Sequence, residues 1–557
     1  MKFRILYIVL SAVTVVSCKK NFLEKFPVDK PSSATFFSNE TELTLAINSA
    51  YRSLYWLSND DVPYQLFIDG ATDITWIRGD FANMQAIQSG QHTSQTDVFN
   101  SIWANFYDNI ARCNNILDNM HRAKDNVSEQ FYNRIEAQAR FLRAYSYAYL
   151  INLYGDVPLV THLLTLNETQ LARTPKAEIV DQLFADLDFS ANNLPKEWTG
   201  NDKGRITQGA ALGLKARIAL YAGRYDVAAL AAGDVINLGV YSIYPDYRDL
   251  FTHAGENSGE SILSMPFLLA IQTTQMARYL GTRSAPGFSV IVPTQNIVDM
   301  YQCTDGKRID QTAAYDPANP FDNRDPRLEQ SILYPGQWFN TYLFLTHPDS
   351  TTTRRNVNGN ISTVSNLEVT HAYATFTGYI WKKYLDETDL PANVTRSELD
   401  FMLMRYAEVL LTYAEAKIEL NQIDQSVIDA INQVRQRPGV NMPAALLSMG
   451  QTELSDLVHY ERTIELAGEG LRLFDIRRWQ IAEGVLPGNV LGRRNKAHWY
   501  DAITPGFNAY GKPEYADENL IFQTISFNLF NPGRDYLWPV PAREMDLNKA
   551  LTQNPGY

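Results

Sequence analysis

The chain has 557 residues, of which 45% are hydrophobic and 20% are charged, and its net charge is −13. This length corresponds to about three units of typical domain size. The apolar fraction suffices for a large core, so the chain is not expected to be disordered. The acidic balance argues against nucleic acid as the main partner, because a phosphate backbone attracts basic surfaces.

The first 17 residues have the pattern of a signal peptide. Lys2 and Arg4 precede residues 5–16, which carry no charge, and Ser17 is a small residue at a plausible cleavage point. A helix of about 12 residues is only about 18 Å long, too short to cross a hydrocarbon core of about 30 Å. We therefore predict export and cleavage, which removes two basic residues and takes the net charge from −13 to −15.

Cys18 directly follows the small residue Ser17. Residues 15–18, Val-Val-Ser-Cys, resemble a bacterial lipobox, in which the cysteine is lipidated and becomes the mature N-terminus. The alternative is an ordinary signal peptide with a cysteine nearby. A lipid on Cys18 would hold the protein at a membrane without a spanning segment. Of the other cysteines, Cys113 lies in a helical pattern that favours a buried free thiol, and a bridge to Cys303 stays possible.

Helical periodicity dominates three parts of the chain. Apolar and aromatic residues recur at helical spacing from Arg134 to a stop at Gly155. Residues 210–238 hold two helices with a break at Gly223, and alanines in the second helix permit close packing. Residues 402–420 and 426–437 predict another helical pair. Gly223, Tyr225 and Ala228 resemble the turn and second-helix positions of a tetratricopeptide repeat, although the 34-residue period is not clean.

Periodicity fades between residues 241 and 400, where turn signals such as Asp-Pro, Asn-Pro and Pro-Gly are frequent. Short strands are expected here but cannot be placed. A second loop-rich stretch covers residues 493–532. Long ordered loops on a helical scaffold are where binding surfaces usually lie.

Signals for catalysis and metal binding are mostly negative. The chain has no HExxH motif, no Cys/His cluster and no GxSxG motif, so we expect no catalytic residue, metal or cofactor. Glu461 and Glu465 share one helix face and could form the acid/base pair of a glycoside hydrolase. The alternative, which we favour, is that Arg472, Arg477 or Arg478 neutralises them, because unpaired buried charge is costly.

Aromatic residues in the loops are the better lead for a site. Five of them lie within residues 334–344, and Trp76 lies among acidic residues and an arginine. Rings beside polar groups suit sugars, whose apolar faces stack while hydroxyls form hydrogen bonds. We predict Trp76 and Trp338 as stacking platforms, with Asp73, Arg78 and Tyr342 as polar partners. The alternative is that these aromatics only pack the loops onto the scaffold.

Motifs of one known family are spread along the chain. They are Cys18 with Phe22-Leu23-Glu24; Asp325-Pro326-Arg327-Leu328; Arg405-Tyr406-Ala407-Glu408 leading into Tyr413-Ala414-Glu415-Ala416; Glu461-Arg462, Glu465, Gly470, Arg472, Asp475 and Arg477-Arg478-Trp479; Trp538-Pro539-Val540-Pro541 with Glu544 and Asn548; and Gln553-Asn554-Pro555-Gly556-Tyr557. On these residues the chain resembles the SusD/RagB family of nutrient-binding outer membrane lipoproteins.

The resemblance implies a mainly α-helical fold, in which four tetratricopeptide-like helix pairs support a loop-rich ligand face with few short strands. It also implies a lipoprotein on the outer membrane of Bacteroidota, exposed at the cell surface. Such a protein is the lid of a TonB-dependent, SusC-like transporter: it captures an oligosaccharide and delivers it, and it is not an enzyme. The alternatives are a peptide-binding lid of a RagA-like transporter and a hydrolase that uses Glu461 and Glu465.

The expected organisation follows from these patterns and from the resemblance. The chain is divided into a signal peptide (1–17), a lipidated N-terminus and tether (18–38), an N-terminal helical region (39–245), a loop-rich ligand-binding region (246–400) and a C-terminal helical and loop region (401–557), interleaved as one body.

Overall fold

The computed structural model describes residues 36–79 and 83–557. The predicted signal peptide, Cys18 and most of the predicted tether therefore lie outside the described residues. One large hydrophobic core contains side chains from Phe37 to Leu551, so both ends of the described chain share it. Among the described residues, no helix is long and apolar enough to cross a membrane.

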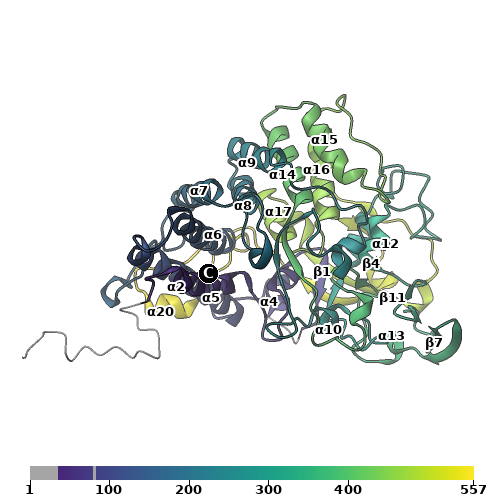
Figure 1. Cartoon of the computed structure of the whole chain (residues 1–557). Coiled ribbons are helices and arrows are strands. Elements are labelled where there is room, and N and C mark those ends of the chain that lie inside the picture. The colour runs from purple at the N-terminus through teal and green to yellow at the C-terminus, as the bar shows by residue number, and fades with distance from the viewer. Residues whose placement is uncertain (1–35, 80–82) are drawn as a thin grey trace, which may run out of the picture.

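Packed helices form the left-hand and upper parts of the molecule in Figure 1. Its members are α2 (Glu40–Ala50), α5 (Asp97–Asn119), α6 (Glu129–Tyr154), α7 (Lys176–Asn193), α8 (Gln208–Tyr221), α9 (Tyr225–Asn237), α14 (Tyr406–Glu419), α15 (Gln425–Arg435) and α16 (Gln451–Glu465). Each helix from α5 to α9 packs on the next, α9 packs on α14, and α14 packs on α15 and α16. This arrangement confirms the predicted mainly helical scaffold with tetratricopeptide-like packing.

The long helix α6 shows how local sequence sets the scaffold. The Ser128 side chain accepts a hydrogen bond from the Phe131 N–H and caps the start of the helix. Gly155 follows the last helical residue with a φ of 76°, a value that glycine adopts without steric cost. The stop predicted at Gly155 is confirmed, and most side chains after Ile135 are buried because neighbouring helices cover α6 on more than one side.

The predicted helix start at Met402 is wrong. Residues Phe401–Arg405 form strand β10, which pairs antiparallel with β2 (Ser261–Met265), and α14 begins at Tyr406. All five residues of β10 are buried. A strand buried on both faces is apolar without alternation, so its pattern cannot be told from that of a helix segment.

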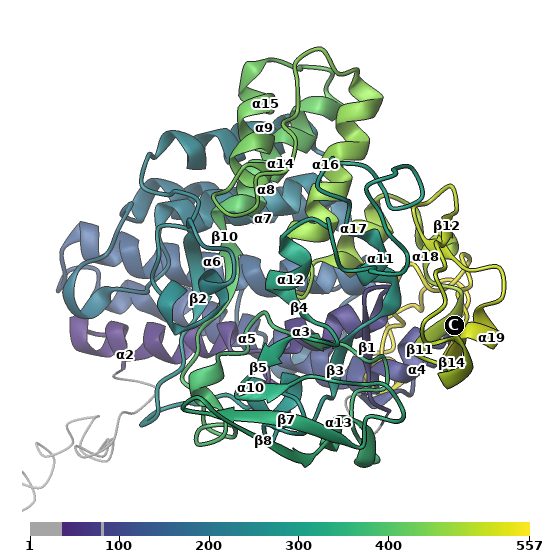
Figure 2. The same cartoon turned by 90° about the vertical axis from the view of Figure 1, so that its right-hand side faces the viewer.

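The part of the molecule beside the scaffold consists of long loops with short strand pairs and short helices (Figure 2). The strand pairs are β1 (Thr75–Ile77) with β3 (Ile291–Pro293), β4 (Ile332–Leu333) with β9 (Ile380–Trp381), β11 (Gly488–Arg494) with β14 (Phe522–Asn528), and β12 (Gly506–Phe507) with β13 (Pro513–Glu514). A four-stranded sheet contains β5 (Trp338–Phe339), β6 (Tyr342–Leu343), β7 (Thr352–Val357) and β8 (Asn360–Ser365).

The short helices are α3 (Tyr64–Ile68), α4 (Met84–Gln88), α10 (Met276–Leu280), α11 (Gln295–Met300), α12 (Arg327–Ser331), α13 (Leu367–Thr370), α17 (Arg472–Arg478), α18 (Ala482–Val485), α19 (Glu518–Ile521) and α20 (Ala542–Leu547).

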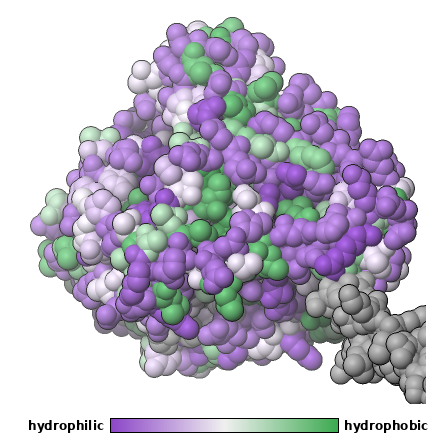
Figure 3. Space-filling view, turned by 90° about the vertical axis from the view of Figure 1, so that its left-hand side faces the viewer, coloured by the Kyte–Doolittle hydropathy of each residue, from purple (hydrophilic) through white to green (hydrophobic). Residues whose placement is uncertain are grey.

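Cys113 and Cys303 are both free and buried, so they do not form the bridge that the sequence left open. Burial raises the pKa of the Cys113 thiol to about 12. The face of the molecule in Figure 3 is mostly hydrophilic, with scattered hydrophobic residues.

Gly470, between α16 and α17, packs closely against helix α3 and the 3₁₀ turn that follows it. Its φ is 79°, its N–H donates to Asp69 Oδ2 at 3.0 Å, and an added Cβ would lie 2.6 Å from the Gln65 carbonyl oxygen. Neither the backbone conformation nor the space at this position therefore permits a side chain.

We expect Gly470→Ala to lower the free energy of unfolding by about 1–2 kcal/mol through the left-handed conformation and by about 1–3 kcal/mol more through overpacking. Thermal unfolding followed by circular dichroism measures the change. Gly506→Ala is the matched control, because a Cβ there meets no atom within 4 Å. Equal midpoints for the two variants would contradict the prediction.

Candidate functional site

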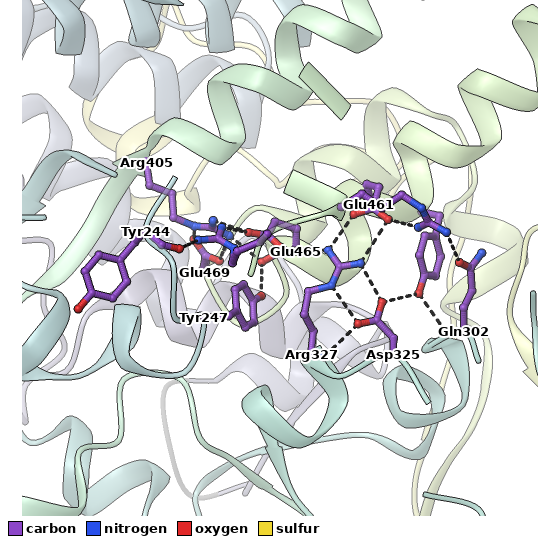
Figure 4. A network of polar contacts seen from close by, with 12 residues as sticks. Tyr244, Tyr247, Gln302, Asp325, Arg327, Arg405, Glu461, Glu465 and Glu469 are labelled. Carbon is purple, nitrogen blue, oxygen red and sulfur yellow. Dashed lines mark hydrogen bonds and ion pairs between the residues drawn. The ribbon is translucent and has the colours of Figure 1, made fainter. Parts of the chain in front are cut away.

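Glu461 and Glu465, on the last turns of α16, lie inside a network of buried ion pairs (Figure 4). Both side chains are 0% exposed. Arg327 contacts Glu461 at 2.8 Å and Glu465 at 3.0 Å. Arg435 also pairs with Glu461, while Arg405 and Arg437 contact Glu465 at 2.8 and 2.7 Å.

This network is unsuited to general acid catalysis. Burial by itself would raise the pKa of Glu465, but the guanidinium groups of Arg437, Arg405 and Arg327 hold that pKa well below its usual range. A general acid needs a raised pKa and contact with substrate. A carboxylate with no exposed surface cannot contact one.

The structure supports neutralisation of these glutamates but corrects the predicted partners. Arg472 binds Asp73 with two hydrogen bonds, Arg478 pairs with Glu415 and Asp475, and Arg477 donates to the Asn152 carbonyl oxygen. The arginines that neutralise Glu461 and Glu465 come from distant parts of the chain, so spacing along the sequence could not identify them.

Three of the predicted site residues are buried around β1. Trp76 is 3% exposed and packs on Phe376, with ring centroids 5.2 Å apart. Both carboxylate oxygens of Asp73 bind Arg472, at 3.0 and 2.9 Å. Arg78 is also buried; it donates to the Phe288 carbonyl oxygen, and its guanidinium lies over the Tyr373 ring.

This burial corrects the expectation that Trp76 is a stacking platform with Asp73 and Arg78 as partners. A ring without an accessible face cannot stack on a sugar, and a carboxylate engaged by an arginine at both oxygens is not free to bind hydroxyls. The three side chains instead pack the β1 loop against β3 and α17, as the packing alternative described.

Trp338 and Tyr342 lie together on the four-stranded sheet, on β5 and β6. Trp338 is 44% exposed, and Tyr342 is half-buried. Arg354 and Arg355 of β7 lie over their rings, with the guanidinium carbon 5.8 Å from the Trp338 ring centroid and 5.1 Å from that of Tyr342. Both residues are accessible, and their role in binding stays a prediction.

A cavity of about 240 Å³ opens a few residues away from this sheet, where α11, β11 and several loops meet. Pro335 and Thr346, on either side of the β5–β6 hairpin, line it, whereas Trp338 does not. The aromatic residues that line the cavity are Tyr315, Phe321, Tyr379, Trp499, Tyr500 and Tyr515. The charged residues are Asp299, Arg324, Arg493, Arg494 and Asp501.

One wall of the cavity is a hydrogen-bonded chain around Asp299 on α11. Tyr515 donates to Asp299 Oδ2 at 2.7 Å, and Gln295 donates to Oδ1 at 2.9 Å. Tyr379 donates to Gln295 Oε1 at 2.8 Å, which completes the chain. Burial raises the pKa of Asp299 to about 6, although the Tyr515 hydrogen bond opposes this. These bonds orient the rings of Tyr515 and Tyr379.

The rim of the cavity is aromatic and exposed. Tyr500, in the loop after β11, is 83% exposed, and its ring stacks on His347 with a centroid distance of 5.5 Å and an interplanar angle of 23°. Trp499 meets the same imidazole edge-on at 4.9 Å. The loop is held because Arg494 donates to the Asp501 carbonyl oxygen at 2.7 Å. Tyr500 therefore presents an open ring face beside polar groups.

Two neighbouring arginines of strand β11 lie in the wall of the cavity. Consecutive residues of a regular strand point to opposite faces, yet Arg493 and Arg494 both line it. The register between β11 and β14 shifts between Leu491 and Arg494, and such irregularities re-aim side chains. Gly492 permits the shift, because a Cβ there would lie 2.9 Å from the Gln523 carbonyl oxygen.

Sequence reasoning missed Trp499 and Tyr500, although it marked residues 493–532 as loop-rich. The available signal was the segment Trp499-Tyr500-Asp501, because two adjacent large rings are unusual in a polar loop. Exposed rings beside hydrogen-bonding groups can bind the faces and hydroxyls of a sugar. The described residues contain no group of three or more His, Cys, Asp or Glu side chains placed to hold a metal ion.

The fold is a helical-repeat scaffold that presents a cavity built from loops. The SusD family model matches residues 256–557, more than half of the chain, and a model described as starch-binding associating with outer membrane matches residues 21–220. The chain belongs to the SusD/RagB family.

Individual relatives agree with this assignment over their whole length. The chain is 26% identical to SusD-like protein P2 of Formosa agariphila, with 100% of both chains covered. It is 28% identical to a solved SusD-like carbohydrate-binding protein from Bacteroides fragilis, with 93% of this chain and 100% of that chain covered and a TM-score of 0.80. A solved laminarin-binding SusD-like protein shares the fold, at 22% identity over 93% of this chain and 100% of that one, with a TM-score of 0.67.

We expect Glu465→Gln to destabilise the protein by about 3–5 kcal/mol, because it leaves buried arginines short of a counter-charge. Chemical denaturation measures the change. Glu453→Gln is the matched control, since Glu453 lies exposed on the same helix. If the two variants unfold at the same denaturant concentration, the network does not hold the fold together.

Proposed function

We propose that this protein captures an oligosaccharide in the cavity beside Tyr500 and delivers it to a SusC-like, TonB-dependent transporter in the outer membrane. Lipidation at Cys18 anchors the protein there, with the binding face at the cell surface. It binds and delivers the ligand without transforming it.

The observation that carries this proposal is the exposed ring of Tyr500 at the rim of a cavity rich in hydrogen-bonding groups. Sugars need both components, a flat apolar surface and directed polar groups. The carbohydrate-binding relative from B. fragilis, at 28% identity, supports the same ligand class. The description of the matching N-terminal family model, starch-binding associating with outer membrane, supports the location.

A peptide ligand is the alternative within this family. Extended peptides are recognised mainly through backbone hydrogen bonds along a strand edge or groove. The exposed ring of Tyr500 beside side-chain donors supports a sugar over an extended peptide, because recognition of such a peptide depends mainly on backbone hydrogen bonds.

We expect Tyr500→Ala to weaken oligosaccharide binding at least about fivefold, since a stacked ring contributes about 1 kcal/mol. Isothermal titration of the mature chain against a panel of neutral and acidic oligosaccharides measures this. Tyr510→Ala is the control, because Tyr510 is exposed but does not line the cavity. Absence of binding to every glycan, together with intact glycan uptake in a deletion strain, would contradict the proposed function.

Trp338→Ala tests whether the platform extends to the four-stranded sheet. We expect weaker binding of longer oligosaccharides and unchanged binding of short ones, because Trp338 lies outside the cavity. Titration with a series of increasing chain length measures the difference. Equal affinity of the variant and the parent protein at every length would remove Trp338 from the site.

A further inference from the structure

The cavity beside Tyr500 is positively charged within an acidic protein. Three arginines line it, Arg324, Arg493 and Arg494, against two aspartates. The whole chain has a net charge of −13, so this local excess of positive charge runs against the general composition. A local potential of the opposite sign to that of the rest of the surface attracts ligands of matching charge.

The two aspartates of the cavity already have partners. Asp299 accepts hydrogen bonds from Tyr515 and Gln295. Asp501 lies at the rim, where its Oδ2 contacts His498 Nδ1 at 2.7 Å. Neither carboxylate accepts a hydrogen bond from one of the three arginines, although the positive charges of Arg324 and Arg494 favour the ionised form of Asp299.

The three guanidinium groups donate to backbone carbonyl oxygens instead. Arg324 donates to the carbonyl oxygens of Val298, Pro320 and Tyr301. Arg493 donates to the Glu368 carbonyl oxygen at 3.2 Å, and Arg494 donates to the Asp501 carbonyl oxygen at 2.7 Å. The buried Glu368 carboxylate is near enough to Arg493 to favour its charged form, but the hydrogen bond between these two residues goes to the Glu368 backbone carbonyl oxygen.

Arg493 is the least satisfied of the three. Its buried Nε has no hydrogen-bond partner among the described residues, and one of its two terminal nitrogens donates to the Glu368 carbonyl oxygen. Burial lowers the pKa of Arg493, which reflects the cost of its charge in this place. An oxyanion beside it would offset this cost through a charge-assisted contact that the planar guanidinium can make bidentate.

We propose that the ligand is an acidic oligosaccharide, in which a carboxylate or sulfate group on one sugar pairs with Arg493 and Arg494 while a sugar ring stacks on Tyr500. This inference rests on the proposed function of the cavity and names the class of glycan that it selects. Arg324, whose donors are occupied by carbonyl oxygens, contributes its positive field rather than a direct contact.

The test is titration of the mature chain with matched pairs of oligosaccharides. One pair is a uronic acid oligosaccharide and its carboxyl-reduced, neutral counterpart, and the other is a sulfated oligosaccharide and its desulfated counterpart. We expect at least one acidic member to bind at least about tenfold more tightly than its neutral partner, with a preference that shrinks as salt concentration rises. The pair that shows the preference identifies the anionic group.

Three variants assign the preference to the cavity. Arg493→Gln should reduce the ratio of acidic to neutral affinity at least about fivefold, whereas Arg493→Lys, which keeps the charge but loses the planar fork of donors, should retain part of the ratio. Arg112→Gln, at an exposed ion pair on α5, removes the same charge elsewhere and should change nothing.

The outcomes separate this inference from the proposed function. Equal binding of acidic and neutral partners, with a loss for both in Tyr500→Ala, would overturn the acidic ligand and keep glycan binding. A preference for acidic glycans that Arg493→Gln and Arg112→Gln reduce equally would also overturn it, because the effect would then be one of net charge. No binding of any member would overturn the proposed function itself.

Discussion

The buried ion pairs around Glu465 join the helical scaffold to the loops, and the rest of the structure depends on them. Glu465 ends α16, Arg405 is the residue before α14, and Arg437 lies just after α15, while Arg327 comes from α12 in the loop-rich part of the chain. The network continues through Glu469, which Arg405 and Lys383 bind at 2.7 and 2.9 Å. Removing water from so many charges is costly, so the arrangement is stable only when every member keeps its partners. This requirement fixes the position of the loops on the scaffold.

A rigid attachment to the scaffold allows the cavity beside Tyr500 to be built from loops. The cavity takes Asp299 from α11, Arg493 and Arg494 from β11, and Tyr500 from the following loop. None of these segments is a long element that could position a side chain alone. Helix α11 packs against β11, and the Tyr515–Asp299 hydrogen bond connects both to the strand β13 region. Affinity for a ligand benefits from such preorganisation, because less conformational entropy is lost on binding.

The sequence predicted the scaffold well and the site poorly, for physical reasons. Helix α6 was predictable because helical periodicity and a glycine stop are local features. Strand β10 was mistaken for helix because complete burial removes alternation. Trp76 was chosen from its polar neighbours, but Asp73, one of those neighbours, pairs with Arg472 and helps to bury the loop. The exposed platform at Tyr500 lay in a stretch whose turns carry no information about which rings face solvent.

The sequence by itself determined the helical fold class and membership of the SusD/RagB family, because periodicity, glycine stops and short motifs are properties of neighbouring residues. Only the tertiary structure decided the pairing of charges and the composition of the cavity. Arg327 and Glu461 are 134 residues apart in the chain, and their contact depends on the packing of α12 against the end of α16. Burial and pairing arise when distant segments meet. The same residue types that suggested a catalytic pair therefore form a structural network, and arginines that are unremarkable in the sequence line the cavity beside Tyr500.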